Sequence, residues 1–531
     1  MKNRTLLLKT RILSRDRCSH GPVGRRIKLA NRPRPATGRW LQGHNVLFFI
    51  TLLCVALASL QIVHAATITV TSTADSGAGS LREALASASD GDTIDFSVTG
   101  TITLTSGQLV VNNSLTISGP GAANLAVNGS AASRIFYISS GKTVTISGLT
   151  ITNGRKSGIG IESQGAGILN DHATLTVSNC TITGNSAAGN GGGIYNTGGL
   201  FGSATLTVNN STISGNTAPA SGGGIHNTGV SFGSATLTVN NSTISGNTAG
   251  GSVGGGVFND GSSSGSAPLT VSNCTISGNS AGSGGGGIYN YFAALDLTDT
   301  ILNTGASGAN ITNNSGTVTS DGYNLSSDAA GGDGMQGPGG FLNHTGDIRN
   351  TNPKLGPLQD NGGPTYTHAL LSCSPAIDGG DPSFTPPPNY DQRGAGYPRV
   401  MNGRLDIGSF EVQEVLPCYS AQIQQPIDAD GTSVFSVRRG VVPVKFTLTL
   451  NGVATCDLPS ATIAVYRTGT GGNQQIDEST YSGPADTGSN FRIDSCQYVY
   501  NLSASALGAG TYRVDILINN QVVGSATFAL R

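Results

Sequence analysis

The stretch LTVNNSTISGNTAPASGGGIHN, residues 206–227, carries the pattern that decides the fold of this 531-residue chain. In it Leu206 and Val208 alternate with Thr207, which is the period of a β-strand with one buried face. Its short apolar segments are separated by turns rich in glycine and asparagine. No helical period is present. The stretch therefore predicts short strands that turn through three faces of one coil.

The same sequence motif recurs several times between residues 175 and 290. Equivalent isoleucines follow one another at intervals of 31, 31 and 32 residues, at Ile182, Ile213, Ile244 and Ile276. One such unit cannot bury its apolar face alone, so the copies must stack. Each copy would add one strand spacing, about 4.8 Å, along the stack. We therefore expect a parallel β-helix.

Asparagines recur at two corners of every copy. Asparagine tolerates a left-handed backbone and can form a hydrogen bond with its own copy one coil above. We expect such corner ladders at Asn185, Asn216, Asn247 and Asn279, and at Asn170, Asn196, Asn227, Asn259 and Asn290. The glycine triplets precede no helix pattern and no lysine, so close backbone packing explains them better than phosphate binding.

Residues 1–65 carry the signature of export. A basic segment precedes the apolar run 46–63, and Val63-His64-Ala65 fits a signal cleavage site. The alternative is that the apolar run is retained as a membrane anchor. Cleavage would leave six cysteines, an even number that permits disulfides. Cys180 and Cys274 lie three coils apart, roughly 14 Å, so they are expected to be buried fillers rather than a pair.

A cap is expected at the first end of the stack, where strand edges would otherwise be exposed. Residues 80–85, SLREAL, predict a short amphipathic helix. Ser80 and Glu83 have the spacing of a capping box.

Residues 75–96, with Ser-Leu-Arg-Glu-Ala at their centre, resemble the CSLREA domain that opens many bacterial surface β-helix proteins. Gly79 stands where that family has its cysteine. The Gly-Gly-Gly-Ile repeats resemble polymorphic outer membrane protein repeats and the pectin-lyase-like group. These resemblances imply an all-β chain with a right-handed parallel β-helix over residues 66–345.

Six ordered motifs resemble the choice-of-anchor Q domain, which is associated with bacterial cell-surface proteins. They are Asn352-Pro353, Leu355-Gly356-Pro357-Leu358, residues 360–365 (DNGGPT), residues 374–378 (SPAID), Asp391-Gln392-Arg393-Gly394 and residues 406–411 (DIGSFE). We therefore assign residues 346–416 to a cap or anchor at the C-terminal end of the β-helix. Paired charges are expected to make this segment rigid, and calcium is the alternative partner for its acidic residues.

Residues 417–531 alternate in short strands, a pattern typical of a β-sandwich. Residues 441–446, VVPVKF, resemble the PxKF domain, an immunoglobulin-like extracellular module. In such a module Cys456 and Cys496 would form the disulfide. A pair between Cys373 and Cys418 is left open.

Charge is scarce, with 11% charged residues and a net charge of -1, so a nucleic-acid partner is not implied. Polysaccharide lyases and hydrolases need acidic clusters, and lyases add a basic residue. Between Asp171 and Asp260 the chain has no Asp, Glu, Lys or Arg. Two charged groups flank the regular coils, and we interpret both as solvated loop charges: Arg155, Lys156, Glu162, Asp171 and His172, and Asp296, Asp299, Asp321 and Asp328.

One set of outward positions suggests a binding surface. The residue after each buried Ile or Val of the Gly-rich strand should face outward, which gives Leu169, Tyr195, His226, Phe258 and Tyr289. Stacked aromatic rings can form a platform for sugars. The alternative is a stabilising ladder covered by the loops that carry Phe201 and Phe232.

These observations predict a non-catalytic secreted or cell-surface protein, adhesin-like or carbohydrate-binding, with the β-helix as a rigid scaffold. Tyr195, His226, Phe258 and Tyr289 are its candidate ligand-binding residues, and no catalytic residue or metal ligand is assigned. The expected partner is a polysaccharide or cell-surface glycan, and a membrane is contacted only through the N-terminal signal or the anchor. The alternative function is a pectate-lyase-like enzyme with its site at a charged end of the β-helix.

Overall fold

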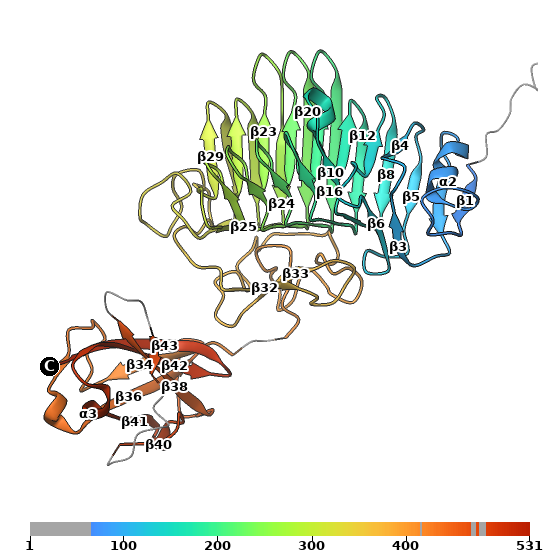
Figure 1. The fold of residues 1–531 in the computed structure, drawn as a ribbon. Coiled ribbons are helices and arrows are strands. Elements are labelled where there is room, and N and C mark those ends of the chain that lie inside the picture. Colours follow the sequence, from blue (N-terminus) through green and yellow to red (C-terminus); the bar gives the residue numbers. More distant parts are fainter. Residues whose placement is uncertain (1–64, 415–416, 469–473, 477–484) are drawn as a thin grey trace, which may run out of the picture. The chain divides into compact units, whose positions relative to one another are not determined.

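The computed structural model describes residues 65–414, 417–468, 474–476 and 485–531, and most of its regular elements are β-strands (Figure 1). A parallel β-helix is followed in the sequence by an antiparallel β-sandwich, which confirms the predicted fold class. The basic segment and the apolar run of residues 1–64 lie outside the described residues. In the described part, no helix is long and apolar enough to cross a membrane.

Ten parallel strands form one face of the β-helix, called sheet 1 here. Equivalent residues pair without a shift, so that Leu175 pairs with Leu206 and Leu206 pairs with Leu237. Each copy of the repeat therefore makes one coil. In order along the sheet the strands are β1 (Thr67–Val70), β2 (Thr93–Phe96), β5 (Thr116–Ser118), β8 (Thr143–Ser147), β12 (Thr174–Ser178), β16 (Ser203–Asn209), β20 (Ser234–Asn240), β24 (Leu269–Ser272), β27 (Ala294–Thr298) and β30 (Thr317–Gly322).

Two further parallel sheets complete the coils. Sheet 2 contains β3 (Gly100–Thr103), β6 (Leu125–Asn128), β9 (Thr150–Thr152), β13 (Thr181–Thr183), β17 (Thr212–Ser214), β21 (Thr243–Ser245), β25 (Thr275–Ala281), β28 (Ile301–Thr304) and β31 (Leu325–Ser326), with the short strands β10 (Arg155–Lys156), β14 (Ser186–Ala187), β18 (Thr217–Ala218) and β22 (Thr248–Ala249). Sheet 3 contains β4 (Leu109–Val111), β7 (Phe136–Ile138), β11 (Ile168–Asp171), β15 (Ile194–Thr197), β19 (Ile225–Thr228), β23 (Val257–Asp260), β26 (Ile288–Tyr291) and β29 (Ile311–Asn314).

The interior of the β-helix is a single apolar column. Each coil contributes residues from all three sheets, such as Leu206 and Val208 from sheet 1, Ile213 from sheet 2 and Ile225 from sheet 3, and all four are fully buried. Cys180 and Cys274 are buried in the same column and unpaired, as predicted. Burial raises the pKa of both thiols to about 12, so they are not reactive nucleophiles at ordinary pH.

Buried asparagine ladders run along two corners of the coils. The Asn185 amide donates to Asn216 and the Asn216 amide donates to Asn247, both at 2.9 Å. The second ladder passes from Asn196 to Asn227 at 2.6 Å. These hydrogen bonds confirm the predicted ladders.

The expectation of a left-handed backbone at the ladder residues is wrong. The positive φ angles of each coil fall instead on other positions, such as Asn210 at 48° and Gly215 at 62°. The reason is that different residues turn the chain and bond the next coil. Asn210 and Gly215 turn the chain, whereas Asn216 uses its amide to bond the next coil.

Helix α2 (Leu81–Ser87) packs against β1 and β4 at the first end of the stack, where the sequence predicts a cap. The Ser80 hydroxyl accepts a hydrogen bond from the Glu83 backbone N–H, and the Glu83 carboxylate accepts one from Gly79. Leu81 and Leu85 are buried in the apolar column. At Gly79, φ is +74° and a Cβ would lie 2.2 Å from the Thr71 hydroxyl, so glycine suits this turn.

The far end of the apolar column is covered by residues 327–350, which lack regular strands. Leu342 is fully buried against the column. Arg349 is buried beside this loop and forms an ion pair with Asp333 at 3.0 Å.

Residues 353–412, named the strap here, run back along sheet 2 rather than extending the stack (Figure 1). Their regular structure is the antiparallel pair β32 (Leu355–Gln359) and β33 (Thr367–Leu370). The strap covers the outward threonines of three successive coils. These are Thr212, Thr243 and Thr275, which are all buried.

The remaining strands form two sheets around their own apolar core, antiparallel except for the parallel pair of β35 and β43. One sheet contains β34 (Tyr419–Gln424), β36 (Val441–Leu450), β37 (Val453–Thr455), β40 (Arg492–Asp494) and β41 (Gln497–Ser503). The other contains β35 (Val434–Phe435), β38 (Ala461–Thr468), β39 (Gln474–Ile476), β42 (Gly510–Ile518) and β43 (Gln521–Leu530). In the core, the rings of Phe446 and Tyr498 stack with centroids 4.3 Å apart.

Candidate functional site

The predicted aromatic ladder forms on the outer side of sheet 3. Tyr195 pairs with His226, His226 with Phe258, and Phe258 with Tyr289, in the register of the parallel strands. Successive ring centroids are 4.9, 4.8 and 5.7 Å apart. Leu169 occupies the position before Tyr195 and is buried. The repeat therefore brings all four candidate residues into one row.

The centre of this ladder is not open to solvent. His226 is 5% exposed and Phe258 is 8% exposed. The backbone at the glycine triplet closely approaches the ladder residue of the same coil, so that a Cβ at Gly222 would lie 2.7 Å from the Cβ of His226. Gly222 also has a φ of +69°. Glycine is thus required at this position by the positive φ and by the close approach of the backbone to the ladder residue.

Burial lowers the pKa of His226 to about 3, although the carbonyl of Ser221 partly opposes the shift. The imidazole is therefore neutral across the physiological range and lies between two aromatic rings. Tyr195 and Tyr289 remain partly exposed at the two ends of the row. As a binding platform the ladder offers its two tyrosines, whereas its centre stabilises the stack of coils.

Two other rings are far more exposed. Phe201 and Phe232 are 79% and 65% exposed, and their rings stack with centroids 5.5 Å apart and planes 3° from parallel. They lie on equivalent loops, between β15 and β16 and between β19 and β20. The sequence left open whether these loops cover the aromatic ladder. In the structure their phenylalanine rings are exposed to solvent.

The backbone holds this phenylalanine pair in an unusual conformation. Phe201 and Phe232 have φ angles of 66° and 62°, where a bulky side chain costs energy. The two loops bond each other in register, with Phe201 N–H donating to Ser231 at 3.2 Å and Ser234 N–H donating to Gly202 at 2.9 Å. Phe-Gly-Ser recurs at residues 201–203 and 232–234, 31 positions apart, which is the sequence signal for this pair.

The charged group before the regular coils forms a small hydrogen-bonded cluster. Asp171 bonds Tyr137 at 2.7 Å and His172 at 2.5 Å, and His172 Nε2 lies 2.6 Å from the carbonyl of Gly199. Burial alone would lower the pKa of His172, but the bonds to Gly199 and Asp171 raise it above its ordinary value. Both ring nitrogens are occupied, so His172 offers no nitrogen to a substrate.

Several of the other charges at the two ends also bond the protein itself. Lys156 pairs with Glu162 at 2.7 Å, while Arg155 is exposed. Asp299 is buried and accepts from the backbone of Asp381 at 2.8 Å, and its pKa is raised to about 6 by burial. Asp296 is partly exposed, Asp321 is exposed, and Asp328 caps a turn at Ala330. Across the described residues, no three His, Cys, Asp or Glu side chains gather as a metal-binding group.

Paired charges fill the interior of the strap. Arg393 bonds Asp391 at 2.6 Å, and its guanidinium lies between the rings of Tyr397 and Phe410 at 3.9 and 3.8 Å from their centroids. Arg399, Asp406 and Glu411 form a second, fully buried group. Burial, with the charge of Asp406, raises the pKa of Glu411 to about 8. These groups have the structural role that the sequence predicts for the charges of residues 346–416.

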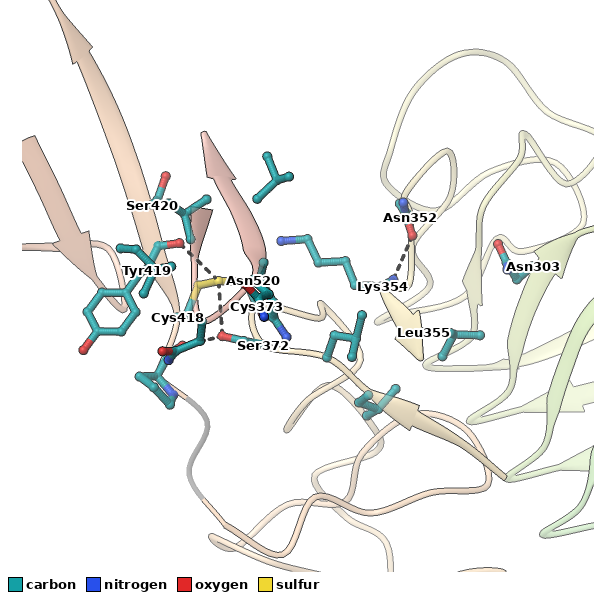
Figure 2. Close-up of a pocket in the computed structure, with 18 residues that line it drawn as sticks. Asn303, Asn352, Lys354, Leu355, Ser372, Cys373, Cys418, Tyr419, Ser420 and Asn520 are labelled. Atoms are coloured by element: carbon teal, nitrogen blue, oxygen red, sulfur yellow. Dashed lines mark hydrogen bonds between the residues drawn. A yellow bond between two sulfur atoms is a disulfide. The ribbon is translucent and has the colours of Figure 1, made fainter. Parts of the chain in front are cut away.

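Two disulfides tie the chain together. Cys456 and Cys496 are bonded within the β-sandwich, with their Cα atoms 5.0 Å apart. Cys373 of the strap is bonded to Cys418, just before β34. Figure 2 shows this second disulfide, with Ser372 beside it. The Ser372 hydroxyl donates a hydrogen bond to the carbonyl of Pro417. Disulfides of this kind are typical of proteins that fold outside the cytoplasm.

Comparison with protein-family models, with curated protein sequences and with solved structures gave no match to this chain.

Proposed function

We propose that this chain is a non-catalytic protein of the cell exterior that binds a polysaccharide or cell-surface glycan, with its β-helix as a rigid scaffold. The observation that carries the proposal is the stacked, solvent-exposed pair of Phe201 and Phe232. Exposed aromatic rings are costly in water and mark contact surfaces. The apolar faces of sugar rings are suited to packing against them.

The scaffold favours binding because it fixes the rings before a ligand arrives. Backbone hydrogen bonds join the two loops to each other, and the loops extend from adjacent coils of a hydrogen-bonded stack. Little conformational freedom is therefore lost on binding. Tyr195 lies at one partly exposed end of the aromatic ladder, and Leu200, which precedes Phe201 in the sequence, is a further exposed apolar side chain.

The cellular location rests on three supports. The two disulfides favour an oxidising compartment. The N-terminal export signature and the resemblance of the later segments to choice-of-anchor Q and PxKF domains favour a bacterial cell surface or secretion. We propose that the strap and the β-sandwich serve this surface location.

The proposal is tested with the full chain and a panel of neutral and acidic polysaccharides, by pull-down of insoluble polymers and calorimetry of soluble ones. We expect Phe201→Ala with Phe232→Ala to abolish binding of the polymer that the unaltered chain retains. Phe292→Ala is the matched control, because Phe292 is 50% exposed and has a φ of 48° but is not part of the stacked pair. Equal binding by the double variant would refute the role of the ring pair.

The same incubations distinguish binding from catalysis. A lyase acting on polyuronates in the presence of calcium would release unsaturated product, which absorbs in the ultraviolet. We expect no product. Product formation by the unaltered chain would replace the binding proposal with the lyase alternative.

A further inference from the structure

The outward side of sheet 1 is an ordered array of threonines. In four successive coils two threonines flank a buried residue, so that two columns run up the sheet. The first column is Thr143, Thr174, Thr205 and Thr236. The second is Thr145, Thr176, Thr207 and Thr238, and it continues to Thr270 in β24. All nine residues are partly or fully exposed, and we name this surface the threonine face.

The threonine face repeats regularly in two directions. Neighbouring coils are separated by the strand spacing of about 4.8 Å, and the two threonines of one strand by roughly 6.8 Å. Thr174 pairs with Thr205 and Thr205 with Thr236 without any shift in register. The buried asparagine ladders fix this register, because Asn185, Asn216 and Asn247 bond one another across the same coils. Side-chain ladders of this kind also favour a flat sheet.

The chemistry of this face is uniform. Strands β5, β8, β12, β16, β20 and β24 contain no ionisable and no aromatic residue. Apart from serines and asparagines beside the columns, the outward side chains are threonines, each with one hydroxyl and one methyl group. Threonine is stiff about χ1, so stacked copies present their hydroxyls in a repeated arrangement.

The strap provides an internal comparison. On sheet 2 the equivalent outward threonines bond polar groups of the strap, with Thr243 donating to Gln392 at 2.6 Å and Thr275 accepting from Ser409 at 3.1 Å. On the threonine face, by contrast, none of the nine hydroxyls bonds another group of the chain within residues 65–414. A row of threonine hydroxyls can thus engage a polar partner, and on sheet 1 that partner is not supplied by the described chain.

From these observations we propose that the threonine face binds the surface of ice. Its two repeat distances are close to the spacings of water oxygens on faces of hexagonal ice, so hydroxyl groups can take lattice positions across several coils. Ions retain their own hydration shells and do not fit an ice lattice, which agrees with the lack of charge. The methyl groups order the water between the hydroxyl columns.

A polysaccharide is the less suitable partner for this face. A protein binds a sugar chain at a few subsites, which commonly contain aromatic rings. The threonine face has no aromatic rings, and it repeats over several coils. A crystalline solid repeats in two directions in the same way. This inference is independent of the ring pair at Phe201 and Phe232, which lies on other loops and is tested separately.

The test is freezing-point hysteresis and the shape of a single ice crystal, measured by nanolitre osmometry with the full chain. We expect faceted crystals and a measurable hysteresis with the unaltered chain. Thr207→Lys and Thr238→Lys should each reduce the hysteresis several-fold, because the ammonium group disrupts the array. Thr103→Lys is the matched control, since Thr103 is an exposed outward threonine of sheet 2.

Circular dichroism confirms that each variant is folded before it is compared. Round crystals and no hysteresis with the unaltered chain would overturn the proposal. Equal loss in Thr103→Lys would overturn it as well, because the effect would then not depend on sheet 1. Retention on an insoluble polysaccharide that Thr207→Lys abolishes, without any effect on ice, would assign this face to a glycan instead.

Discussion

The Thr243 hydroxyl donates a hydrogen bond of 2.6 Å to the amide oxygen of Gln392, 149 positions later in the chain. The amide nitrogen of Gln392 in turn donates to Thr212, one coil below, at 2.9 Å. All three side chains are fully buried. One glutamine of the strap therefore links two coils of the β-helix.

Replacing this glutamine should loosen the strap. Gln392→Ala removes the hydrogen bonds that join the strap to Thr212 and Thr243 at this point, although Thr212 still donates to the Tyr366 carbonyl and Thr243 still bonds the Ser409 hydroxyl. We therefore expect a total cost of about 1–3 kcal/mol. We expect a clearly lower melting temperature by differential scanning calorimetry. Gln359→Ala is the control, because Gln359 is exposed in the same segment. An unchanged melting temperature for Gln392→Ala would mean that the strap does not stabilise the coils.

The β-helix could be predicted from the sequence because its contacts are periodic. Ile182, Ile213 and Ile244 recur at the spacing of one coil, and one repeat fixes the pairing of every other repeat. The asparagine hydrogen bonds follow from the same register. The positions of the left-handed turns could not be predicted in this way. Asn210 and Asn216 are the same residue type, but only Asn210 has a left-handed backbone, whereas Asn216 belongs to the ladder.

The path of the strap and the exposure of the rings could not be predicted. The bond between Thr243 and Gln392 joins distant residues that no repeat relates. Alternation indicates that Tyr195 and Phe258 face outward, but it does not show what covers an outward side chain. Here Phe258 is 8% exposed, with the rings of His226 and Tyr289 of the neighbouring coils on either side of it. Phe201 and Phe232 lie in loops, where strand periodicity gives no information.

The pH dependence of stability should have an alkaline side that arises in the strap. The pKa of Glu411 is raised from 4.5 to about 8, chiefly by burial, and that of Asp406 to about 6. The folded chain therefore holds protons that the unfolded chain has released, so the contribution of these two carboxyl groups to stability falls as pH rises from about 4.5 to about 8. Above that range this contribution no longer changes with pH.

The check is the free energy of unfolding measured from pH 5 to pH 9. Glu411→Gln should reduce the slope because it removes the main titrating group. The exposed Glu414 provides the control variant Glu414→Gln, which should keep the slope of the unaltered chain. A Glu411→Gln slope equal to that of the unaltered chain would contradict the assignment.

Acid sensitivity should arise in the aromatic ladder. Burial lowers the pKa of His226 to about 3. Below pH 6.5 the unfolded chain therefore binds a proton at this histidine that the folded chain does not bind. The contribution of His226 to stability should therefore fall as pH falls below 6.5, by roughly 2–3 kcal/mol over the first two pH units, and in that range it opposes the contribution of Glu411. His226→Phe, which keeps a ring between Tyr195 and Phe258, should remove this loss.

Unfolding at pH 6.5 and pH 4.5 measures the difference. His344→Phe is the control, because His344 is exposed and lies outside the ladder. If His226→Phe loses as much stability in acid as the unaltered chain does, His226 is not the acid-sensitive group.

The register of the coils should depend on the buried asparagine ladder. Asn216 accepts from the Asn185 backbone at 3.0 Å and donates to the Ile182 carbonyl and to Asn247, both at 2.9 Å. Asn216→Ala therefore leaves several buried groups of two neighbouring coils without partners, at about 1–3 kcal/mol each. We expect a larger loss of stability than in Asn209→Ala, whose side chain is partly exposed on sheet 1. Amide hydrogen exchange should be fastest at the coils on either side of residue 216 and unchanged near α2. Protection that is lost evenly along the whole stack would show that the ladder does not act coil by coil.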